Sequence, residues 1–305
     1  MAILIDEQAS VLIQGITGRF GSFVARLMRD YGTNVAAGVT PGRGGQDVWG
    51  IPVYNTVEEA WNGHGPFDVS LIVVPGPVVK AAALEAINAG IKLIHMEVER
   101  VPLHDTLEVL ARARKAGIRI IGPGSGGIIS PGKAVIGFIG AAEEISKVAF
   151  KPGRIGVISR SGGQTSTLCY VICQAGLGIS TAINLGSETI LGTTPAELLL
   201  LFQEDDETDA VAYFGEIGTV MEEEAAEIIN EGKYTKPFVA YIAGRGLTAG
   251  IRFSHASAII EGGRGTAESK VKALQDVGAY VVDKPEDIGP TLAQLLKENA
   301  GEKEL

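Results

Sequence analysis

The fold is set first by the stretch Ser10-Val11-Leu12-Ile13-Gln14-Gly15-Ile16-Thr17-Gly18-Arg19-Phe20-Gly21. Its apolar start predicts a short strand, and Phe23, Leu27 and Met28 recur behind it at helical spacing. Between strand and helix lie glycines that let the backbone approach a phosphate, and the helix start supplies free N–H groups. The stretch is therefore typical of a mononucleotide-binding unit, although its spacing is G-x-x-G-x-x-G and not G-x-G-x-x-G.

The second strand of this unit indicates which nucleotide it binds. Residues 34–39 form an apolar run that leads into the loop Thr40-Pro41-Gly42-Arg43-Gly44-Gly45. A fold that binds NAD usually carries Asp or Glu at the end of this strand to hold the ribose 2′-hydroxyl, and none is present here. Because Arg43 in a glycine-rich loop suits a phosphate, we expect NADP or coenzyme A.

Strands and helices alternate along the rest of the chain. Apolar runs at 69–74, 92–96 and 119–121 predict strands, and helical patterns at 78–89 and 103–116 follow the first two. After an irregular segment with Pro-Gly turns, a second set of strands is predicted at 154–159, 180–185, 210–214, 237–243 and 280–282. This alternation predicts an α/β fold with parallel sheets: a Rossmann-like domain at 1–122, a connector at 123–153 and a flavodoxin-like domain at 154–305.

Three polar features lie at strand ends of the second set. Ser161, Gly162 and Gly163 form a turn at a helix start, which is a typical anion site; a serine that only caps the helix is the alternative. Glu216 lies between glycines after a strand. His255 stands among small residues ahead of a glycine-rich turn, where it either carries a phosphoryl group or lines a loop. Because parallel strands end at one edge, we expect these features to converge.

The composition limits the classes of function. The chain of 305 residues is 46% apolar and 20% charged, which is typical of a globular protein with two domains. A net charge of -10 without a basic face argues against nucleic-acid binding, and no apolar run is long enough to span a membrane. The cysteines and histidines show no metal-ligand spacing. We expect no metal site, no signal peptide and a reducing cytoplasm.

Several ordered segments resemble the α subunits of succinyl-CoA synthetases and other NDP-forming acyl-CoA synthetases. The resemblance covers nearly the whole chain and rests on the segments Ile3-Leu4-Ile5-Asp6, Gln14-Gly15-Ile16-Thr17-Gly18, Gly38-Val39-Thr40-Pro41-Gly42-Arg43-Gly44-Gly45, Pro52-Val53-Tyr54-Asn55-Thr56-Val57, Ser159-Arg160-Ser161-Gly162, Gly215-Glu216-Ile217-Gly218 and the residues around His255. It implies a CoA-binding domain followed by a ligase domain in an ADP- or GDP-forming carboxylate–CoA ligase. It also implies a separate ATP-grasp β subunit, in an αβ or α2β2 assembly, that brings ATP or GTP with Mg²⁺.

The resemblance assigns roles to individual residues. His255 matches the histidine that is phosphorylated during turnover, and Glu216 matches the glutamate that holds its ring. Ser161, Gly162 and Gly163 open the helix whose N-terminus receives the phosphoryl group. Contacts to CoA are implied for Gly15, Thr17, Gly18, Arg19, Phe20, Arg43, Glu97, Val98 and Glu99, where Arg43 stands in place of a lysine.

The chain also departs from the succinate enzymes near the expected acyl site. Arg100 replaces a glycine, Ser166 replaces a tyrosine assigned to substrate contact, and Ser125 lies in an altered glycine-rich segment. The sequence Ser159-Arg160-Ser161-Gly162-Gly163 is closer to ATP-citrate lyase and citryl-CoA synthetase. We therefore expect a small di- or polyacidic carboxylate other than succinate, contacted by Ser125, Ser166 and Arg100.

Two other functions remain open on the sequence alone. The flanks of His255 differ from the family's Gly-His-Ala-Gly-Ala, so a non-catalytic CoA-binding regulatory protein is one alternative. An NADP-dependent oxidoreductase with a Rossmann-like domain is the other, and it fits the second glycine–serine turn poorly.

Overall fold

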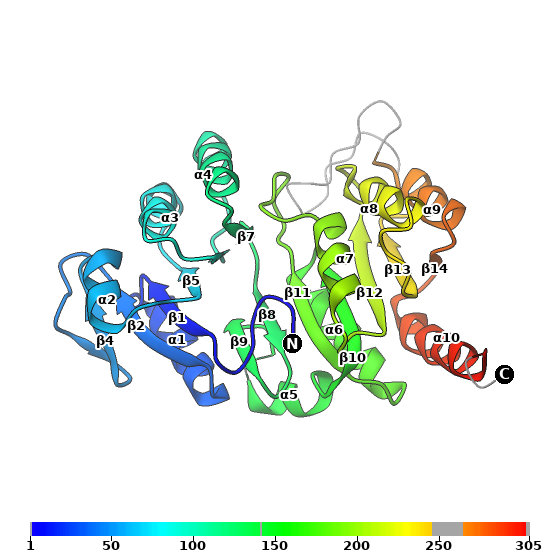
Figure 1. Cartoon of the computed structure of the whole chain (residues 1–305), viewed down its shortest axis with the longest axis horizontal. Helices are drawn as coiled ribbons and strands as arrows, with labels where there is room; N and C mark the ends of the chain where they lie inside the picture. The colour runs from blue at the N-terminus through cyan, green and yellow to red at the C-terminus, as the bar shows by residue number, and fades with distance from the viewer. Residues whose placement is uncertain (1, 141, 246–264, 303–305) are drawn as a thin grey trace.

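The chain forms two sheets of seven strands each within the residues that the structure, a computed structural model, describes: 2–140, 142–245 and 265–302 (Figure 1). The first sheet has the strand order β3-β4-β2-β1-β5-β6-β7, and the second has the order β14-β13-β12-β10-β11-β8-β9. Each sheet is parallel except at one end, where β3 pairs with β4 and the β8–β9 hairpin pairs with β11 in antiparallel fashion. The predicted α/β fold class is confirmed.

The first sheet and its helices come from the N-terminal part of the chain. In chain order the elements are β1 (Ser10–Gln14), α1 (Arg19–Tyr31), β2 (Asn34–Val39), β3 (Asp47–Val48), β4 (Ile51–Tyr54), α2 (Val57–His64), β5 (Val69–Ile72), η1 (Gly76–Val78), α3 (Val79–Asn88), β6 (Leu93–Met96), α4 (Leu103–Lys115) and β7 (Arg119–Ile121).

The second sheet begins inside the segment that the sequence presented as a connector. Its elements are β8 (Gly127–Ser130), β9 (Ala134–Gly137), α5 (Glu143–Ala149), β10 (Pro152–Ser159), α6 (Gly162–Gln174), β11 (Ile179–Asn184), α7 (Pro195–Glu204), β12 (Ala210–Glu216), α8 (Met221–Asn230), β13 (Phe238–Ala243), α9 (Ala267–Asp276), β14 (Tyr280–Val282), η2 (Pro285–Asp287) and α10 (Ile288–Glu302).

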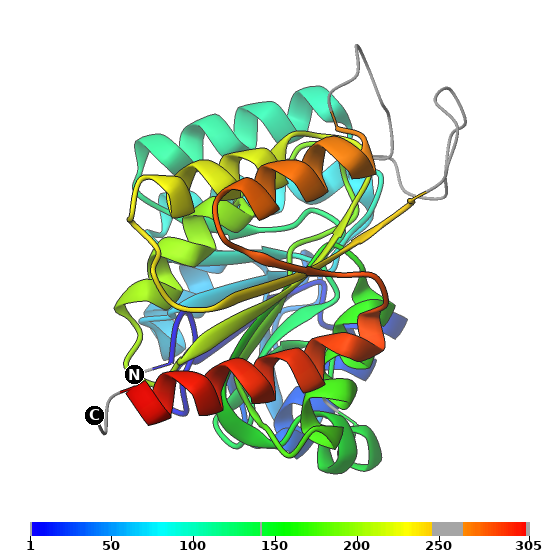
Figure 2. The same ribbon diagram turned by 90° about the vertical axis from the view of Figure 1, so that its right-hand side faces the viewer.

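Helices cover both faces of the sheets. Figure 2 shows α4, α8 and α9 in one layer and α10 on the opposite side of the strands. The helix predicted after the first glycine turn is present as α1, and Phe23, one of the apolar residues at helical spacing, is 45% exposed. The helix instead turns Val24, Ala25 and Met28 to the core, and Phe23 packs against the neighbouring exposed ring of Phe20.

The carboxyl edges of the two sheets adjoin at one crossing of the chain. The end of β7 meets the end of β11, because the N–H of Gly122 donates to Leu185 O at 3.1 Å. Gly122 has a φ of +99°, and a Cβ there would lie 2.2 Å from Met96 O, so only glycine fits. On the far side, Thr33 Oγ1 bonds both backbone groups of Val135 at 3.0 Å and ties the β8–β9 hairpin to the first sheet.

Candidate functional site

The first glycine turn leaves a helix N-terminus open. Helix α1 follows Gly18, which has extended backbone angles and supplies no side-chain cap. Gly15 has a φ of +91°, and a Cβ on Gly21 would lie 2.2 Å from Gly15 O, so the turn and helix touch through backbone alone. The turn and the first residues of α1 include Thr17, Arg19 and Phe20. Arg19 and Phe20 are exposed, and Thr17 is partly buried. Free N–H groups and a positive helix end at a strand tip are suited to a phosphate.

The loop after β2 places the predicted cation beside this turn. The N–H of Thr17 approaches Thr40 Oγ1 at 3.4 Å, which joins the tips of β1 and β2. Asn55 Oδ1 accepts from the N–H groups of Gly42 and Gly44 at 3.0 Å each and shapes the loop. Arg43 is exposed there and has no ion-pair partner among the described residues. Its guanidinium is therefore available to a ligand phosphate.

A buried polar cluster lies at the tip of β6. Ser125 Oγ donates to Asn184 O, which leaves its lone pairs for the Gly127 N–H at 3.3 Å and for His95 Nε2 at 2.8 Å. A hydroxyl has one proton, so His95 carries its proton on Nε2 and presents a bare Nδ1. Burial lowers the pKa of His95 to about 3, which keeps the ring neutral. Ser125, expected to contact substrate, is fully buried with its hydroxyl engaged by these three groups.

Glu97 is the second unusual group of this tip. Neither of its carboxyl oxygens, nor His95 Nδ1, has a hydrogen-bond partner in the part of the chain that the structure describes. Burial raises the pKa of Glu97 well above its usual range, so the carboxyl favours its protonated form. Next to it, Glu99 Oε1 accepts from Ser187 Oγ at 3.3 Å, and Val98 O accepts from the N–H of Gly124 at 3.0 Å. The predicted CoA loop therefore contacts the loop that follows β11.

The second glycine turn presents another open helix start. Helix α6 begins at Gly162 after Ser161, whose side chain makes no capping hydrogen bond. The alternative that this serine merely caps the helix is therefore wrong. Among the residues that the structure describes, a Cβ on Gly162 would have only Asn184 Oδ1 within 4 Å, at 3.8 Å, and one on Gly163 would have no neighbour within 4 Å. By contrast α2, α7 and α9 begin at threonines that do cap them. The backbone N–H groups at the start of α6 are thus without a side-chain cap, as a site for an anion requires.

Glu216 lies one strand away from this helix start. Strands β10 and β12 are neighbours, with Ser159 opposite Phe214, and Glu216 follows at the carboxyl end of β12. Its carboxylate lies 3.5 Å from Arg160 Nη2. The predicted convergence of Ser161 and Glu216 at one edge is therefore present in the structure.

His255 lies outside the described residues, and the chain on either side of it reaches this same edge. Ala243, near the last described residue before the gap, pairs with Glu216 in the sheet. Gly265, the first described residue after it, accepts a hydrogen bond from the N–H of Gly218 at 2.7 Å. Of the remaining predicted residues, Ser166 lies on α6 and is partly buried, and Arg100 is exposed after β6.

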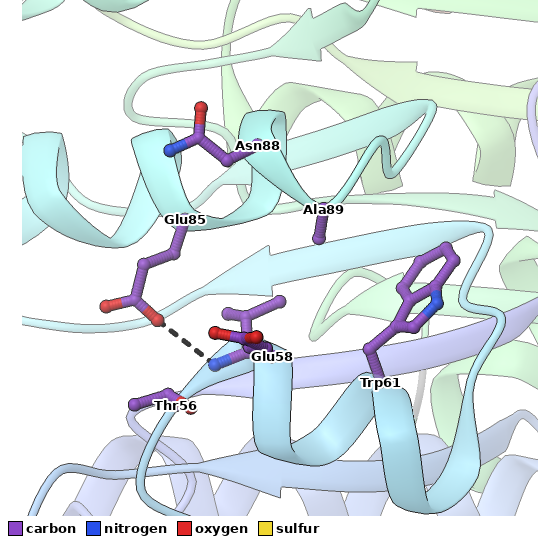
Figure 3. Close-up of a pocket in the computed structure, with 7 residues that line it drawn as sticks. Thr56, Glu58, Trp61, Glu85, Asn88 and Ala89 are labelled. Atoms are coloured by element: carbon purple, nitrogen blue, oxygen red, sulfur yellow. Dashed lines mark hydrogen bonds between the residues drawn. The ribbon is translucent and has the colours of Figure 1, made fainter.

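Features elsewhere in the described chain do not provide a second candidate site for a phosphate or a metal. A cavity of about 450 Å³ lies between α2 and α3 and is lined by the carboxylates of Glu58 and Glu85 (Figure 3). Glu85 accepts from the Val57 N–H at 3.0 Å. Two carboxylates make the cavity unsuited to a polyphosphate. Among the described residues there is no cluster of metal-ligating side chains, and no helix there is long and apolar enough to cross a membrane. Cys169 and Cys173 are buried free thiols.

Known proteins are similar to this chain in sequence over nearly its whole length. Residues 6–98 match the model of the CoA binding domain, and residues 158–280 match that of CoA-ligase. Subunit alpha 2 of the ADP-forming succinate–CoA ligase of Archaeoglobus fulgidus is 46% identical over 97% of this chain and 100% of its own length. An ADP-forming sulfoacetate-CoA ligase subunit of Bilophila wadsworthia is 42% identical over 97% of this chain and 100% of its own.

A solved structure supports the same fold. The ATP citrate lyase of Methanothrix soehngenii, in complex with citrate and coenzyme A, superimposes with a TM-score of 0.91 and 24% identity over 99% of this chain. The chain spans about half, 52%, of that lyase polypeptide. The resemblance inferred from sequence is confirmed by the full-length relatives. With its CoA-binding and ligase domains in this order, the chain belongs to the family of α subunits of nucleoside-diphosphate-forming CoA ligases.

Proposed function

We propose that this α subunit forms an acyl-CoA from CoA, ATP or GTP and a small carboxylate with at least one further acidic group. The reaction passes through a phosphohistidine at His255 and an acyl phosphate. The observation that carries the proposal is the uncapped start of α6 at Ser161, one strand from the carboxylate of Glu216. An anion cradle beside an oriented carboxylate supplies both groups that a phosphorylated imidazole requires.

Each group then has one task. A neutral ring nitrogen of His255 attacks the terminal phosphorus of the nucleotide, and the bond to the diphosphate breaks. Glu216 accepts the N–H of the other ring nitrogen and stabilises the imidazolium that forms. The N–H groups of Gly162 and Gly163 stabilise the phosphoryl oxygens. The phosphoryl group passes to the substrate carboxylate, and the CoA thiol displaces phosphate from the resulting acyl phosphate.

The first domain supplies CoA. We place its phosphates at the start of α1, against Gly15, Thr17, Gly18, Arg19 and Phe20, with Arg43 as the cation. The thiol end of CoA extends to the loop of Glu97, Val98 and Glu99, at the seam where the carboxyl edges of the two sheets meet. The nucleotide and Mg²⁺ are assigned to an ATP-grasp β subunit in an αβ or α2β2 assembly, because the relatives are named as subunits of ligases.

A labelling experiment tests the mechanism. The chain, co-purified with its β subunit, is incubated with γ-labelled ATP or GTP, and we expect acid-labile label that is lost in His255→Ala and in Glu216→Gln. His104→Ala is the matched control, because His104 is an exposed histidine on α4 and should leave the label unchanged. Label that survives in His255→Ala contradicts the proposal. CoA binding without any label favours a non-catalytic CoA-binding protein, and binding of NADP in place of CoA favours an oxidoreductase.

The substrate is addressed separately. Relatives are named for succinate and for sulfoacetate, each of which carries a carboxylate and a second anionic group. Arg100 is exposed beside the seam and is held in a left-handed backbone conformation, φ +57°, by the bond from its N–H to Glu188 Oε1 at 2.7 Å. We propose that Arg100 meets the second anionic group and that Ser166 leaves room for it. Thioester formation from succinate, malate, citrate and sulfoacetate, with Arg100→Gly as the variant, tests this assignment.

A further inference from the structure

Arg160 is a fully buried cation at the centre of the candidate active site. It follows the last residue of β10, and its side chain is 0% exposed. A guanidinium has five N–H donors in a planar fork, and the structure offers five acceptors. They are Gly186 O at 3.3 Å, Glu188 O at 3.2 Å, Thr219 Oγ1 at 3.4 Å, Met221 Sδ at 3.2 Å and Glu216 Oε1 at 3.5 Å.

These acceptors come from two loops other than the one that carries Arg160. Gly186 and Glu188 follow β11, whereas Glu216 ends β12, Thr219 follows it and Met221 begins α8. Burying an isolated charge is strongly unfavourable unless it is paired and hydrogen-bonded, so Arg160 fixes these loops relative to one another. A lysine would not replace it, because an ammonium is a compact charge with three donors.

Glu216 is held from a second direction at its backbone. Its N–H donates to Glu222 Oε1 at 3.3 Å, and the same oxygen accepts from Tyr213 Oη at 2.7 Å. The other carboxylate oxygen of Glu222 pairs with the fully buried Lys270. The backbone of Glu216 is thus anchored by the Glu222–Lys270 pair, and its carboxylate is oriented by Arg160.

The loop after β11 extends this contact toward the first domain. The main-chain oxygen of Glu188 accepts a hydrogen bond from Arg160, and its side-chain Oε1 accepts one from the Arg100 N–H at 2.7 Å. Glu188 therefore links Arg160 to Arg100, which follows the proposed CoA loop at the end of β6.

We propose that Arg160 is a positioning residue of the phosphoryl-transfer step: through its ion pair with Glu216 at 3.5 Å it fixes the orientation of that carboxylate for the phosphorylation and dephosphorylation of His255. The inference rests on the proposed function. Arg160 touches neither the phosphoryl group nor substrate, and it acts through the orientation of Glu216. Loss of the fork frees the carboxylate to rotate, and misplacement by about 1 Å lowers a rate by roughly 100-fold.

The experiment measures single-turnover labelling of the co-purified complex for the unchanged chain, Arg160→Lys, Arg160→Ala and Arg160→Ala/Glu216→Gln. We expect labelling to slow by about 100-fold in Arg160→Ala and by less in Arg160→Lys, while the Kd for CoA stays within about two-fold. Millimolar guanidinium should restore part of the rate in Arg160→Ala and none in the double variant. Arg154→Ala is the matched control, because Arg154 is exposed at the opposite end of the same strand.

The outcomes separate the two proposals. An unlabelled parent chain contradicts the proposed function itself. If the parent is labelled, and Arg160→Lys and Arg160→Ala are labelled at the parent's rate, the positioning role is overturned. A slow Arg160→Ala that guanidinium does not restore, or whose CoA affinity falls as far as its rate, assigns Arg160 to general folding and also overturns it. If Arg160→Ala does not fold, the same comparison is made on Arg160→Lys, for which an undiminished rate contradicts the proposal.

Discussion

The two glycine turns of this chain resemble each other in sequence and differ in what shapes them. In the turn after β1, a Cβ on Gly21 would lie 2.2 Å from Gly15 O, so the chain itself fills the space beside the glycines. In the turn after β10, a Cβ on Gly163 would meet nothing within 4 Å in the described part of the chain, and a buried arginine holds the loop. Glycine serves close backbone packing in the first turn. In the second it leaves the start of α6 open, which suits the phosphoryl site that we propose there.

The largest effect is expected from Gly21→Ala. The added methyl group would press on the backbone of Gly15, which cannot move without shifting the strand β1. Overpacking of this kind costs about 3 kcal/mol of unfolding free energy. Urea unfolding measures it, and CoA binding should weaken with it because the start of α1 is displaced. A Gly21→Ala chain as stable as its parent would show that the first turn is not shaped by backbone contact.

Acid sensitivity is the next effect, at about 1.4 kcal/mol for each pH unit, and it concerns His95, which is buried on β6. The folded chain keeps His95 neutral down to its pKa of about 3, whereas the unfolded chain takes up a proton below the ordinary value of 6.5. Stability from this group is therefore complete above pH 6.5 and is lost as the pH falls toward 3, by about 1.4 kcal/mol per pH unit. Unfolding free energies at several pH values should fall less steeply in His95→Gln.

The exposed His104 provides the control for that slope. His104→Gln removes a histidine that the fold does not bury and should leave the steepness unchanged. Parallel curves for His95→Gln and the unchanged chain between pH 6.5 and 4 would mean that His95 is protonated in the folded state.

Arg43→Ala separates the ligands of the two turns. We expect a roughly ten-fold weaker Kd for CoA, because one charge-assisted contact to phosphate is lost, and a steeper loss at low salt than at high salt. Labelling of the protein by γ-labelled nucleotide should keep its rate. Arg114→Ala on α4 is the control, since that arginine is also exposed. A fall in labelling equal to the fall in CoA affinity would mean that the two turns do not act as separate sites.

The smallest effect on stability, and of opposite sign to Gly21→Ala, is expected from Gly163→Ala. The new methyl group meets no neighbour among the described residues, and alanine is the better helix former by about 0.5–1 kcal/mol. The chain should become slightly more stable while its labelling slows, because the methyl group stands where the phosphoryl oxygens would lie. A destabilised variant with normal labelling would remove the distinction between the turns.

The sequence was sufficient for the parallel strands and the helices that follow them. Buried runs such as 10–14 and 210–214 are continuous and apolar, and each is followed by a helical pattern. It was insufficient for β3 and β4, which are short and carry Pro52, and for the β8–β9 hairpin, whose placement beside β11 depends on a distant strand. Helical spacing alone did not show which side of α1 is buried: Phe23 is exposed, whereas Val24, Ala25 and Met28 face the core.

The sequence likewise predicted part of the candidate site: its glycine turns and one carboxylate, but not the contacts between strands. Spacing and turn chemistry located the open starts of α1 and α6 and the carboxylate of Glu216. They did not reveal that Arg160 is buried, since an arginine at a strand end is usually solvated. An ionisable residue directly after an uninterrupted apolar strand was the available signal. Nor did they reveal that the hydroxyl of Ser125 is engaged by His95 and Asn184, because those partners come from other strands.

The most direct measurement is a crystal structure of the complex with its β subunit after reaction with nucleotide. We expect a phosphoryl group on His255 whose oxygens lie about 3 Å from the N–H groups at the start of α6, with Glu216 hydrogen-bonded to the other ring nitrogen. A phosphorylated His255 directed away from α6, with Glu216 turned from its ring, would contradict it.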